Sequence, residues 1–232
     1  MSICDLRRRH EHIFFRNGNP NIHVFEIDHP DTQRYKKARI RHLEWTIPAN
    51  VRLVPVDFSK DDMTTALLTA GFDPQIPTFF SVLGVTYYLP LALFADSVRK
   101  MGSFQNPENR LVFDFPDEGL PTDSTRGAEL VDITARLGEP MASGYPVTNV
   151  IHMLRQCRFR CEQHLTPMEI ETYYFSSRSD GLHAFENIHF IPGCVSKPKS
   201  TQVSCVPLAK CAQIWHNIAN PNKGVAQYGK TK

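Results

Sequence analysis

Val24-Phe25-Glu26-Ile27-Asp28-His29-Pro30 has the pattern of a short buried strand with an acidic end, and it indicates the architecture of the chain. A second apolar run, Val54-Pro55-Val56-Asp57-Phe58, also ends in Asp and follows one helix-length segment later. Ligands of open α/β sheets bind at the carboxyl ends of the strands, where an acidic side chain can hold the hydroxyls of a ribose. Two such strand ends in succession predict a site for a nucleotide-like ligand.

The chain from residue 22 to about 115 alternates between strand-like and helix-like segments. The pattern predicts strands at 22–28, 51–58, 78–85 and 111–115, separated by helices at 31–43, 59–70 and 90–101. Ser59 is the predicted N-cap of the second helix, and Gly71 is predicted to end it. The unbroken apolarity of the third strand favours burial on both faces, which is typical of a parallel sheet in an α/β fold.

The pattern is looser after residue 116. It predicts helices at 125–137 and 147–156, and strands at 158–164 and 183–191. Beyond that point Pro, Ser, Asn and Gly are spread through a tail that carries several lysines. We therefore expect one domain over 1–192 and an irregular or disordered extension over 193–232.

Composition excludes several classes of protein. The net charge of +2 gives no electrostatic footprint for nucleic acid, so no nucleic-acid partner is predicted. No apolar run approaches the roughly 20 residues that span a bilayer, and the basic N-terminal residues lead into no apolar signal segment. The six cysteines are too few and too scattered for a disulfide framework. A reducing, cytoplasmic compartment is the expected location.

Three segments together resemble the leucine carboxyl methyltransferase family of class I S-adenosylmethionine-dependent methyltransferases. They are 24–30, the run from Gly71-Phe72-Asp73-Pro74 to Ser81, and 83–89. Tyr174-Phe175 and 178–182 extend the likeness, which runs from about residue 13 to about 191. The resemblance implies a Rossmann-like fold with a mostly parallel, nominally seven-stranded sheet and helices on both faces. It also implies S-adenosylmethionine as the cofactor.

The same resemblance implies which residues bind this cofactor. Asp28 matches the acidic position that holds the ribose hydroxyls, and Glu26 stands beside it. Asp57 matches the acidic position near the adenine amine, while Phe58 supplies a backbone N–H and an apolar wall. Leu83 occupies the position where many members have a Glu that contacts the amino-acid end of the cofactor.

The acceptor side of the site is predicted less fully. Tyr87 and Tyr88 follow a buried strand at an expected pocket mouth, and Asp114 ends the next strand. Packing of the two rings and capping of a loop by the carboxylate are the alternatives. A carboxylate acceptor needs no general base, so no catalytic acid or base is assigned. The expected acceptor is a carboxylate or hydroxyl of a small molecule or peptide.

One grouping of potential metal ligands occurs in the sequence. Cys157, Cys161 and His164 lie close together, but their spacing is poor for a zinc knuckle. A fourth ligand would have to come from Cys194 or from a later residue. No metal site is therefore predicted.

The beginning of the chain departs from the family pattern. A strand ending in Gly-x-Gly is expected there, yet Arg7-Arg8-Arg9-His10-Glu11-His12 stands at that place. Glycines serve in such a loop because the backbone must approach the ligand closely, with positive φ at some positions. The central first strand is expected to be truncated to a stub at 2–6, without the family's N-terminal helical cover. A non-catalytic, degenerate or partial methyltransferase that acts as a binding module, or has no activity, is the alternative reading.

Overall fold

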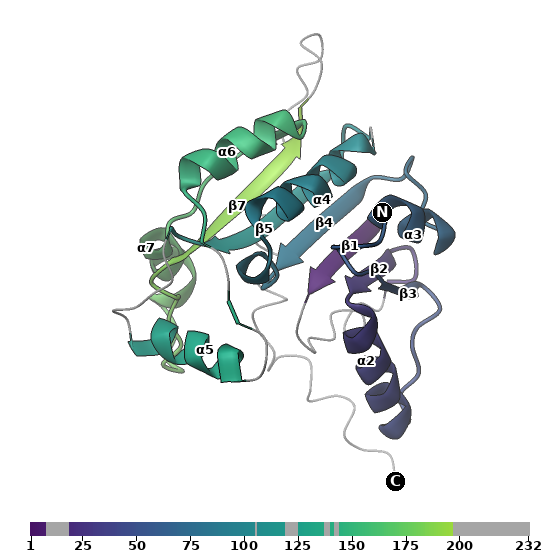
Figure 1. Cartoon of the computed structure of the whole chain (residues 1–232), viewed down its shortest axis with the longest axis horizontal. Helices are drawn as coiled ribbons and strands as arrows, with labels where there is room; N and C mark the ends of the chain where they lie inside the picture. The colour runs from purple at the N-terminus through teal and green to yellow at the C-terminus, as the bar shows by residue number, and fades with distance from the viewer. Residues whose placement is uncertain (8–18, 105, 119–124, 137–139, 142–143, 197–232) are drawn as a thin grey trace.

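The structure, a computed structural model, describes residues 1–7, 19–104, 106–118, 125–136, 140–141 and 144–196 (Figure 1). Its strands are β1 (Ser2–Arg7), β2 (His23–Asp28), β3 (Val51–Pro55), β4 (Thr78–Leu83), β5 (Arg110–Pro116), β6 (Phe159–Cys161) and β7 (Ile188–Val195). Its helices are α2 (Pro30–His42), α3 (Met63–Thr69), α4 (Leu91–Ser103), α5 (Thr125–Arg136), α6 (Val147–Gln156) and α7 (Pro167–Ile170), with the short turns η1 (Thr86–Tyr88) and η2 (Glu171–Phe175).

All seven strands form one sheet in the order β3-β2-β1-β4-β5-β7-β6. The pairs from β3 to β5 are parallel, whereas β7 runs antiparallel to both of its neighbours. Figure 1 shows β1 in the middle of the sheet, between β2 and β4. The chain therefore builds outward from β1 in one direction and then in the other, which confirms the predicted Rossmann-like α/β fold.

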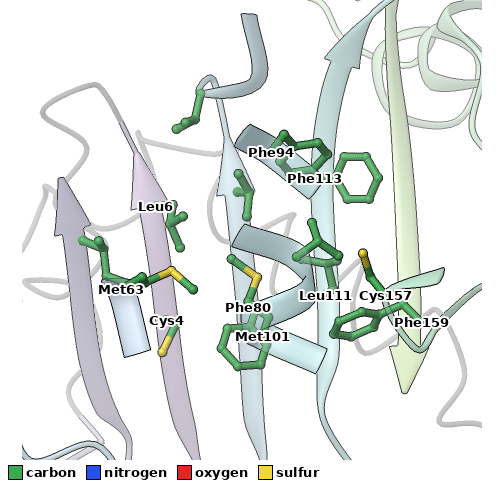
Figure 2. Packing of buried hydrophobic residues seen from close by; sticks show 14 of the residues in the cluster. Cys4, Leu6, Met63, Phe80, Phe94, Met101, Leu111, Phe113, Cys157 and Phe159 are labelled. Carbon is green, nitrogen blue, oxygen red and sulfur yellow. The ribbon is translucent and has the colours of Figure 1, made fainter. Parts of the chain in front are cut away.

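One face of the sheet is apolar along its whole length and packs against α3, α4 and α6. Figure 2 shows Leu6, Phe80 and Phe113 of three neighbouring strands among side chains of α3 and α4. Burying one such side chain contributes about 1.5–3 kcal/mol. The labelled members of this core are Cys4, Leu6, Met63, Phe80, Phe94, Met101, Leu111, Phe113, Cys157 and Phe159.

The opposite face changes character along the strands. Near their amino ends it carries a small apolar cluster of Ile3, Val24, Val51, Phe79 and Val112. Further along β2, the carboxylate of Glu26 forms a buried ion pair with Nζ of Lys36 from α2. The side-chain amide of Gln33 donates to the Glu26 carbonyl at 3.1 Å. These contacts place α2 on this face, so helices cover both faces of the sheet.

The start of α3 differs from the prediction. Asp62, not Ser59, is the N-cap, and its carboxylate accepts a hydrogen bond from the backbone N–H of Thr65 at 2.7 Å. Ser59 instead donates to Asp57, because an Asp can close a turn with a residue two positions later. The helix ends before Gly71, whose φ of 88° is the left-handed conformation that favours glycine.

Two strand boundaries also differ from the sequence-based expectations. β1 spans Ser2–Arg7, which exceeds the predicted stub, and it pairs along this length with β2 and β4. β7 spans Ile188–Val195, and its last residues pair with β6, so the sheet continues past the predicted domain end at 192. Residues 197–232, most of the predicted extension, lie outside the described residues. Within the described part, no helix has the length and apolarity to cross a membrane.

Candidate functional site

The carboxyl ends of the parallel strands bring the predicted site residues to one edge of the sheet. Asp28 ends β2, Leu83 ends β4, and Asp114 lies near the end of β5. Asp57 follows β3, whose continuation is tied to β2 because Val56 N–H donates to the Asp28 carbonyl at 2.9 Å. The strand order reverses between β1 and β4, which is the position where open α/β sheets bind ligands.

The same edge receives a connection from the far side of the sheet. β6 and β5 both run antiparallel to β7, so β6 points in the same direction as β5. β6 therefore ends at this edge and β7 begins there. The connection 162–187 lies at the edge between them.

We call the ends of β2 and β3, with Asp28, His29 and Asp57, the β2–β3 half of the edge. Asp28 is buried, and its Oδ1 accepts a hydrogen bond from the backbone N–H of His29 at 2.8 Å. The ring of His29 lies between the two strands, with Nε2 3.8 Å from Oδ2 of Asp57. This contact is attractive when the imidazole is protonated, and it places the two acidic strand ends side by side.

Asp57 is held by residues that follow it directly. Its Oδ1 accepts from the backbone N–H of Ser59 at 3.0 Å, and its Oδ2 accepts from Nζ of Lys60 at 2.8 Å. These hydrogen bonds, the one from Lys60 first, hold the pKa of the Asp57 carboxyl well below its usual range. The group is therefore an anion across the physiological pH range, while the half-buried Phe58 beside it packs against the core.

Glu26 lies two residues before Asp28 on β2 and points to the same face. It is 3% exposed, and its carboxylate bonds Nζ of Lys36, which is itself 2% exposed. A buried ion pair of this kind anchors α2 to the sheet. The assignment of Glu26 to a cofactor site stays a prediction.

The other part of the edge is called the β4–β7 half. It comprises the ends of β4 and β5, the turn after β4, Tyr145, and the start of β7 with the connection that precedes it. Asp114 makes several hydrogen bonds in this half of the edge. Oδ1 accepts from the backbone N–H of Gly84 and Oδ2 from the hydroxyl of Tyr87, both at 2.8 Å. The Asp114 carbonyl accepts from Oγ1 of Thr86 at 2.7 Å. Asp114 thus fixes the turn after β4, the loop-holding role that the sequence left as one alternative.

The tyrosines of this turn are half-buried. Burial, and then the neighbouring Asp114 carboxylate, raise the pKa of Tyr87 well above its usual value. Tyr87 is therefore a neutral hydroxyl that donates to Asp114. The ring of Tyr88 lies 6.3 Å from that of Tyr87, centroid to centroid, in an edge-to-face arrangement. Leu83, also half-buried, pairs in register with Arg7 of β1.

Tyr145 supports the same turn, although nothing in the sequence singles it out. Its hydroxyl lies 2.9 Å from the carbonyl oxygen of Thr86 and also contacts that of Leu89. The ring is buried and stacks against Phe115 of β5, with centroids 6.4 Å apart. A residue 59 positions away in the chain thus holds the turn after β4.

Two histidines complete this half of the edge, and the sequence reasoning missed them as a pair. Nε2 of His164 lies 2.8 Å from Nδ1 of His189. The rings stack with centroids 4.9 Å apart, and that of His189 stacks on Phe115 at 5.3 Å. Nε2 of His189 lies 3.5 Å from Oδ2 of Asp117. The approach of His164 to His189 spans 25 positions of sequence, so no local motif marks it.

The cysteines near His164 make other contacts. The thiol of Cys157 donates to the carbonyl of Ala95 at 3.5 Å, and that of Cys161 donates to the carbonyl of Gln163 at 3.3 Å. Burial raises the pKa of both thiols. Within the described residues, no three His, Cys, Asp or Glu side chains gather as metal ligands.

Sequence comparison identifies the family of this fold. Residues 12–99 match the family described as leucine carboxyl methyltransferase. A Bacillus subtilis (strain 168) protein, YktD, is 38% identical over 174 residues, which cover 74% of this chain and 57% of that protein. Its name assigns it provisionally to the S-adenosyl-L-methionine-dependent methyltransferases. These matches support a leucine carboxyl methyltransferase-like class I methyltransferase.

Other comparisons agree with this methyltransferase family. A Mycobacterium tuberculosis (strain ATCC 25618 / H37Rv) protein with the same provisional designation is 38% identical over 105 residues, 43% of this chain and 33% of its own length. The chain thus spans 57% and 33% of these two curated relatives.

Solved structures share the fold at low sequence identity. A provisionally assigned methyltransferase from Thermobifida fusca YX has a TM-score of 0.56 and 12% identity, with 84% of this chain and 73% of that chain covered. Mitomycin 7-O-methyltransferase MmcR has a TM-score of 0.52 and 9% identity, with 84% and 49% covered. These likenesses concern the methyltransferase fold alone.

Proposed function

We propose that this methyltransferase-family chain binds S-adenosyl-L-methionine at the carboxyl edge and transfers its methyl group to an oxygen atom of a small molecule or peptide. The cofactor supplies a methyl group already activated on a sulfonium. One observation carries the proposal: the buried Asp28 ends β2, one strand away from the point where the strand order reverses. That is the place where α/β folds hold a ribose.

The chemistry of the edge fits such a ligand. Asp28 is a carboxylate at the end of β2, and ribose hydroxyls are suitable hydrogen-bond donors to a carboxylate. At the end of β4, a Cβ placed on Gly84 would meet no atom within 4 Å, which leaves space for the amino-acid end beside Leu83. The residues at the ends of β2 and β4 therefore suit the ribose and the amino-acid end of the cofactor.

Asp57 and Phe58 suit the adenine in the same way. Phe58 provides an apolar wall, and the Asp57 carboxylate can accept from the exocyclic amine. Its partner Lys60 is 77% exposed, and such surface ion pairs are weak, so the lysine can turn away when a ligand binds.

The acceptor then belongs to the β4–β7 half, because the β2–β3 half holds the nucleoside. We assign contact with the acceptor to Tyr87 and Tyr88, and the positioning of Tyr87 to Asp114, which bonds its hydroxyl. The protein's contribution to methyl transfer is alignment of the acceptor oxygen with the methyl group and exclusion of water.

Calorimetric titration of the full chain with S-adenosylhomocysteine tests the proposal without requiring the acceptor. We expect binding that weakens at least tenfold in Asp28→Asn, because the carboxylate acceptor is lost. Asp132→Asn is the matched control, since Asp132 is exposed and pairs with Arg136 within α5, away from the carboxyl ends of β2 and β3. Equal affinity in the Asp28 variant would reject the site.

One observation favours a second function, that of a non-catalytic binding module. Arg7 ends β1 at the carboxyl edge, where the family has the start of its glycine-rich loop. A folded chain that does not bind S-adenosylhomocysteine would favour this function over methyl transfer.

We also propose a cytoplasmic location. The four described cysteines, Cys4, Cys157, Cys161 and Cys194, are all free thiols, which is usual for proteins of a reducing compartment.

A further inference from the structure

The two histidines of the β4–β7 half come from separate elements and form one stack. His164 follows β6, and His189 lies in β7, where it is in register with Phe115 of β5. His189 is 6% exposed, whereas His164 is half-buried. The His189 ring is thus enclosed, whereas part of His164 is open to solvent.

The surroundings of His189 determine which ring nitrogens carry protons. Its buried Nε2 has no hydrogen-bond partner among the described residues, and Oδ2 of Asp117 lies 3.5 Å away. A lone pair directed at that carboxylate would be repelled, so Nε2 carries the proton. Neutral His189 then presents Nδ1 as an acceptor, and Nε2–H of His164 donates to it across 2.8 Å. Nδ1 is left as the basic atom of His164.

Groups on three neighbouring parts of the chain, β7, α7 and the segment after β5, influence how readily His164 takes a proton. Burial, and then the neighbouring His189 of β7, lower the pKa of His164. Two carboxylates act against this effect, Glu169 of α7 and Asp117 after β5. The net lowering keeps the imidazole neutral near pH 7, which is the form that can accept a proton.

The stack also lies next to the part of the edge that faces an acceptor. Phe115 contacts both histidines and Tyr145, with the ring centroid of His164 at 6.5 Å. Tyr145 in turn holds the turn after β4 through its hydroxyl. A connected set of aromatic rings thus joins His164 to the turn that carries Tyr87 and Tyr88.

Resting on the proposed function, the geometry points to His164 as the residue whose Nδ1 accepts the proton of a hydroxyl acceptor. The acceptor class is then an alcohol or phenol. The O–H proton moves to Nδ1 while an oxygen electron pair forms the bond to the methyl carbon. The methyl–sulfur bond breaks with its electron pair left on sulfur, and the imidazolium later releases its proton to water. A carboxylate acceptor is already an anion and needs no such base.

The protonation pattern can be measured on the full chain before any acceptor is known. Long-range proton–nitrogen spectra of the ¹⁵N-labelled protein at neutral pH should show His164 protonated at Nε2 and bare at Nδ1, with His189 protonated at Nε2. His164→Gln identifies the His164 signals. A proton on Nδ1 of His164 would overturn the proposal.

Methyl transfer with three probes tests the role itself: phenol, catechol and benzoate, each with S-adenosylmethionine. We expect methylation of the hydroxyl probes, reduced about 100-fold or more in His164→Gln at unchanged affinity for S-adenosylhomocysteine. His183→Gln is the matched control, because His183 lies on the same connection with its Nδ1 2.9 Å from Glu171.

Each other outcome overturns the inference. Three results would overturn it while the cofactor still binds. They are transfer to benzoate alone, transfer to hydroxyl probes at an undiminished rate in His164→Gln, and no transfer to any hydroxyl probe. A wild-type chain that fails to bind S-adenosylhomocysteine rejects the proposed function, and this inference with it.

Discussion

The two halves of the carboxyl edge are held together in different ways. In the β2–β3 half, the carboxylates of Asp28 and Asp57 accept hydrogen bonds from residues one to three positions further along the chain, although the Val56 N–H and the Asp28 carbonyl also join the two strands. In the β4–β7 half, the hydrogen bonds of Asp114 to Gly84 and Tyr87 span 30 and 27 positions, and that of Tyr145 to Thr86 spans 59. The first half is locally organised, whereas the second depends on the complete fold.

This difference has a functional meaning. Short-range contacts such as that of Asp57 with the exposed Lys60 can open when a ligand arrives, because each side chain keeps its backbone position. Long-range contacts hold the turn after β4 and the histidine stack in one arrangement before an acceptor binds. Methyl transfer is faster when the acceptor and the methyl group are already held in the reactive geometry, so such preorganisation favours the reaction. The halves should therefore respond differently to substitution, and four measurements examine this.

Lys36→Met should give the largest effect, and it tests an exception within the β2–β3 half. The Lys36–Glu26 pair is buried and ties α2 to β2. Removing the lysine takes a charge partner from the buried Glu26 carboxylate, at a cost of about 3–5 kcal/mol in the free energy of unfolding. Urea denaturation measures this change.

The matched control is the double variant Lys36→Met/Glu26→Leu. Replacing a whole buried ion pair by apolar side chains is often neutral, so most of the lost stability should return. If the double variant is no more stable than the single one, the cost comes from packing and not from an uncompensated charge.

Asp114→Ala should come second, at about 2–3 kcal/mol. It leaves the Gly84 N–H and the Tyr87 hydroxyl without their acceptor, and each such donor costs about 1–3 kcal/mol when it is buried. The counterpart in the other half is Asp57→Ala, whose partners face water, so its effect on urea unfolding should be clearly smaller. Equal losses of stability in the two variants would remove the distinction between the halves.

Tyr145→Phe should cost about 1 kcal/mol, because it removes one hydroxyl and keeps the buried ring. Thermal or urea unfolding measures the change. Tyr173→Phe serves as the control, since Tyr173 is 61% exposed. If both variants matched the wild type, the hydroxyl of Tyr145 would contribute nothing to holding the turn after β4.

The smallest expected effect is in the pH dependence of stability. Burial and His189 lower the pKa of His164, so the unfolded chain binds the proton more readily. Stability should fall as the pH drops below about 6.5, the value of a free histidine, and His164→Gln should flatten that slope. Urea midpoints between pH 5 and 8 provide the measurement.

Asp57 supplies the contrast at lower pH. Its hydrogen bonds lower the pKa of its carboxyl, so the stability it contributes is present above about pH 3.9 and is lost as the pH falls below that value. Asp57→Asn should therefore leave the slope between pH 5 and 8 unchanged. A changed slope there would show that the two halves do not titrate separately.

The fold and the β2–β3 half were largely predictable from the sequence because their signals are local. Apolar runs ending in Asp28 and Asp57 mark two strand ends, and the structure places both at one edge. The boundary of α3 was not predictable in the same way. Both Asp57 and Asp62 can accept hydrogen bonds from backbone N–H groups that follow them. Ser59 donates to Asp57, and Asp62 caps the helix by accepting from Thr65.

The β4–β7 half was predictable only in part. The sequence indicated Tyr87 and Asp114 as separate candidates, but not the bond between them, because its partners lie on different strands. His164 invited only a metal interpretation, since its neighbours in sequence are cysteines. Its partner in space is His189, and only the antiparallel placement of β7 beside β5 brings Asp117 to the same stack.

That placement also has a consequence for synthesis on the ribosome. β7 is the last strand of the sheet in sequence, yet it lies between β5 and β6. Until residues 188–195 have left the exit tunnel, β5 has an open edge and β6 has no strand beside it. An open, apolar strand edge invites pairing with other chains. The nascent chain therefore carries an aggregation hazard until the described sheet is completed, and a chaperone that covers β5 would protect the chain in that interval.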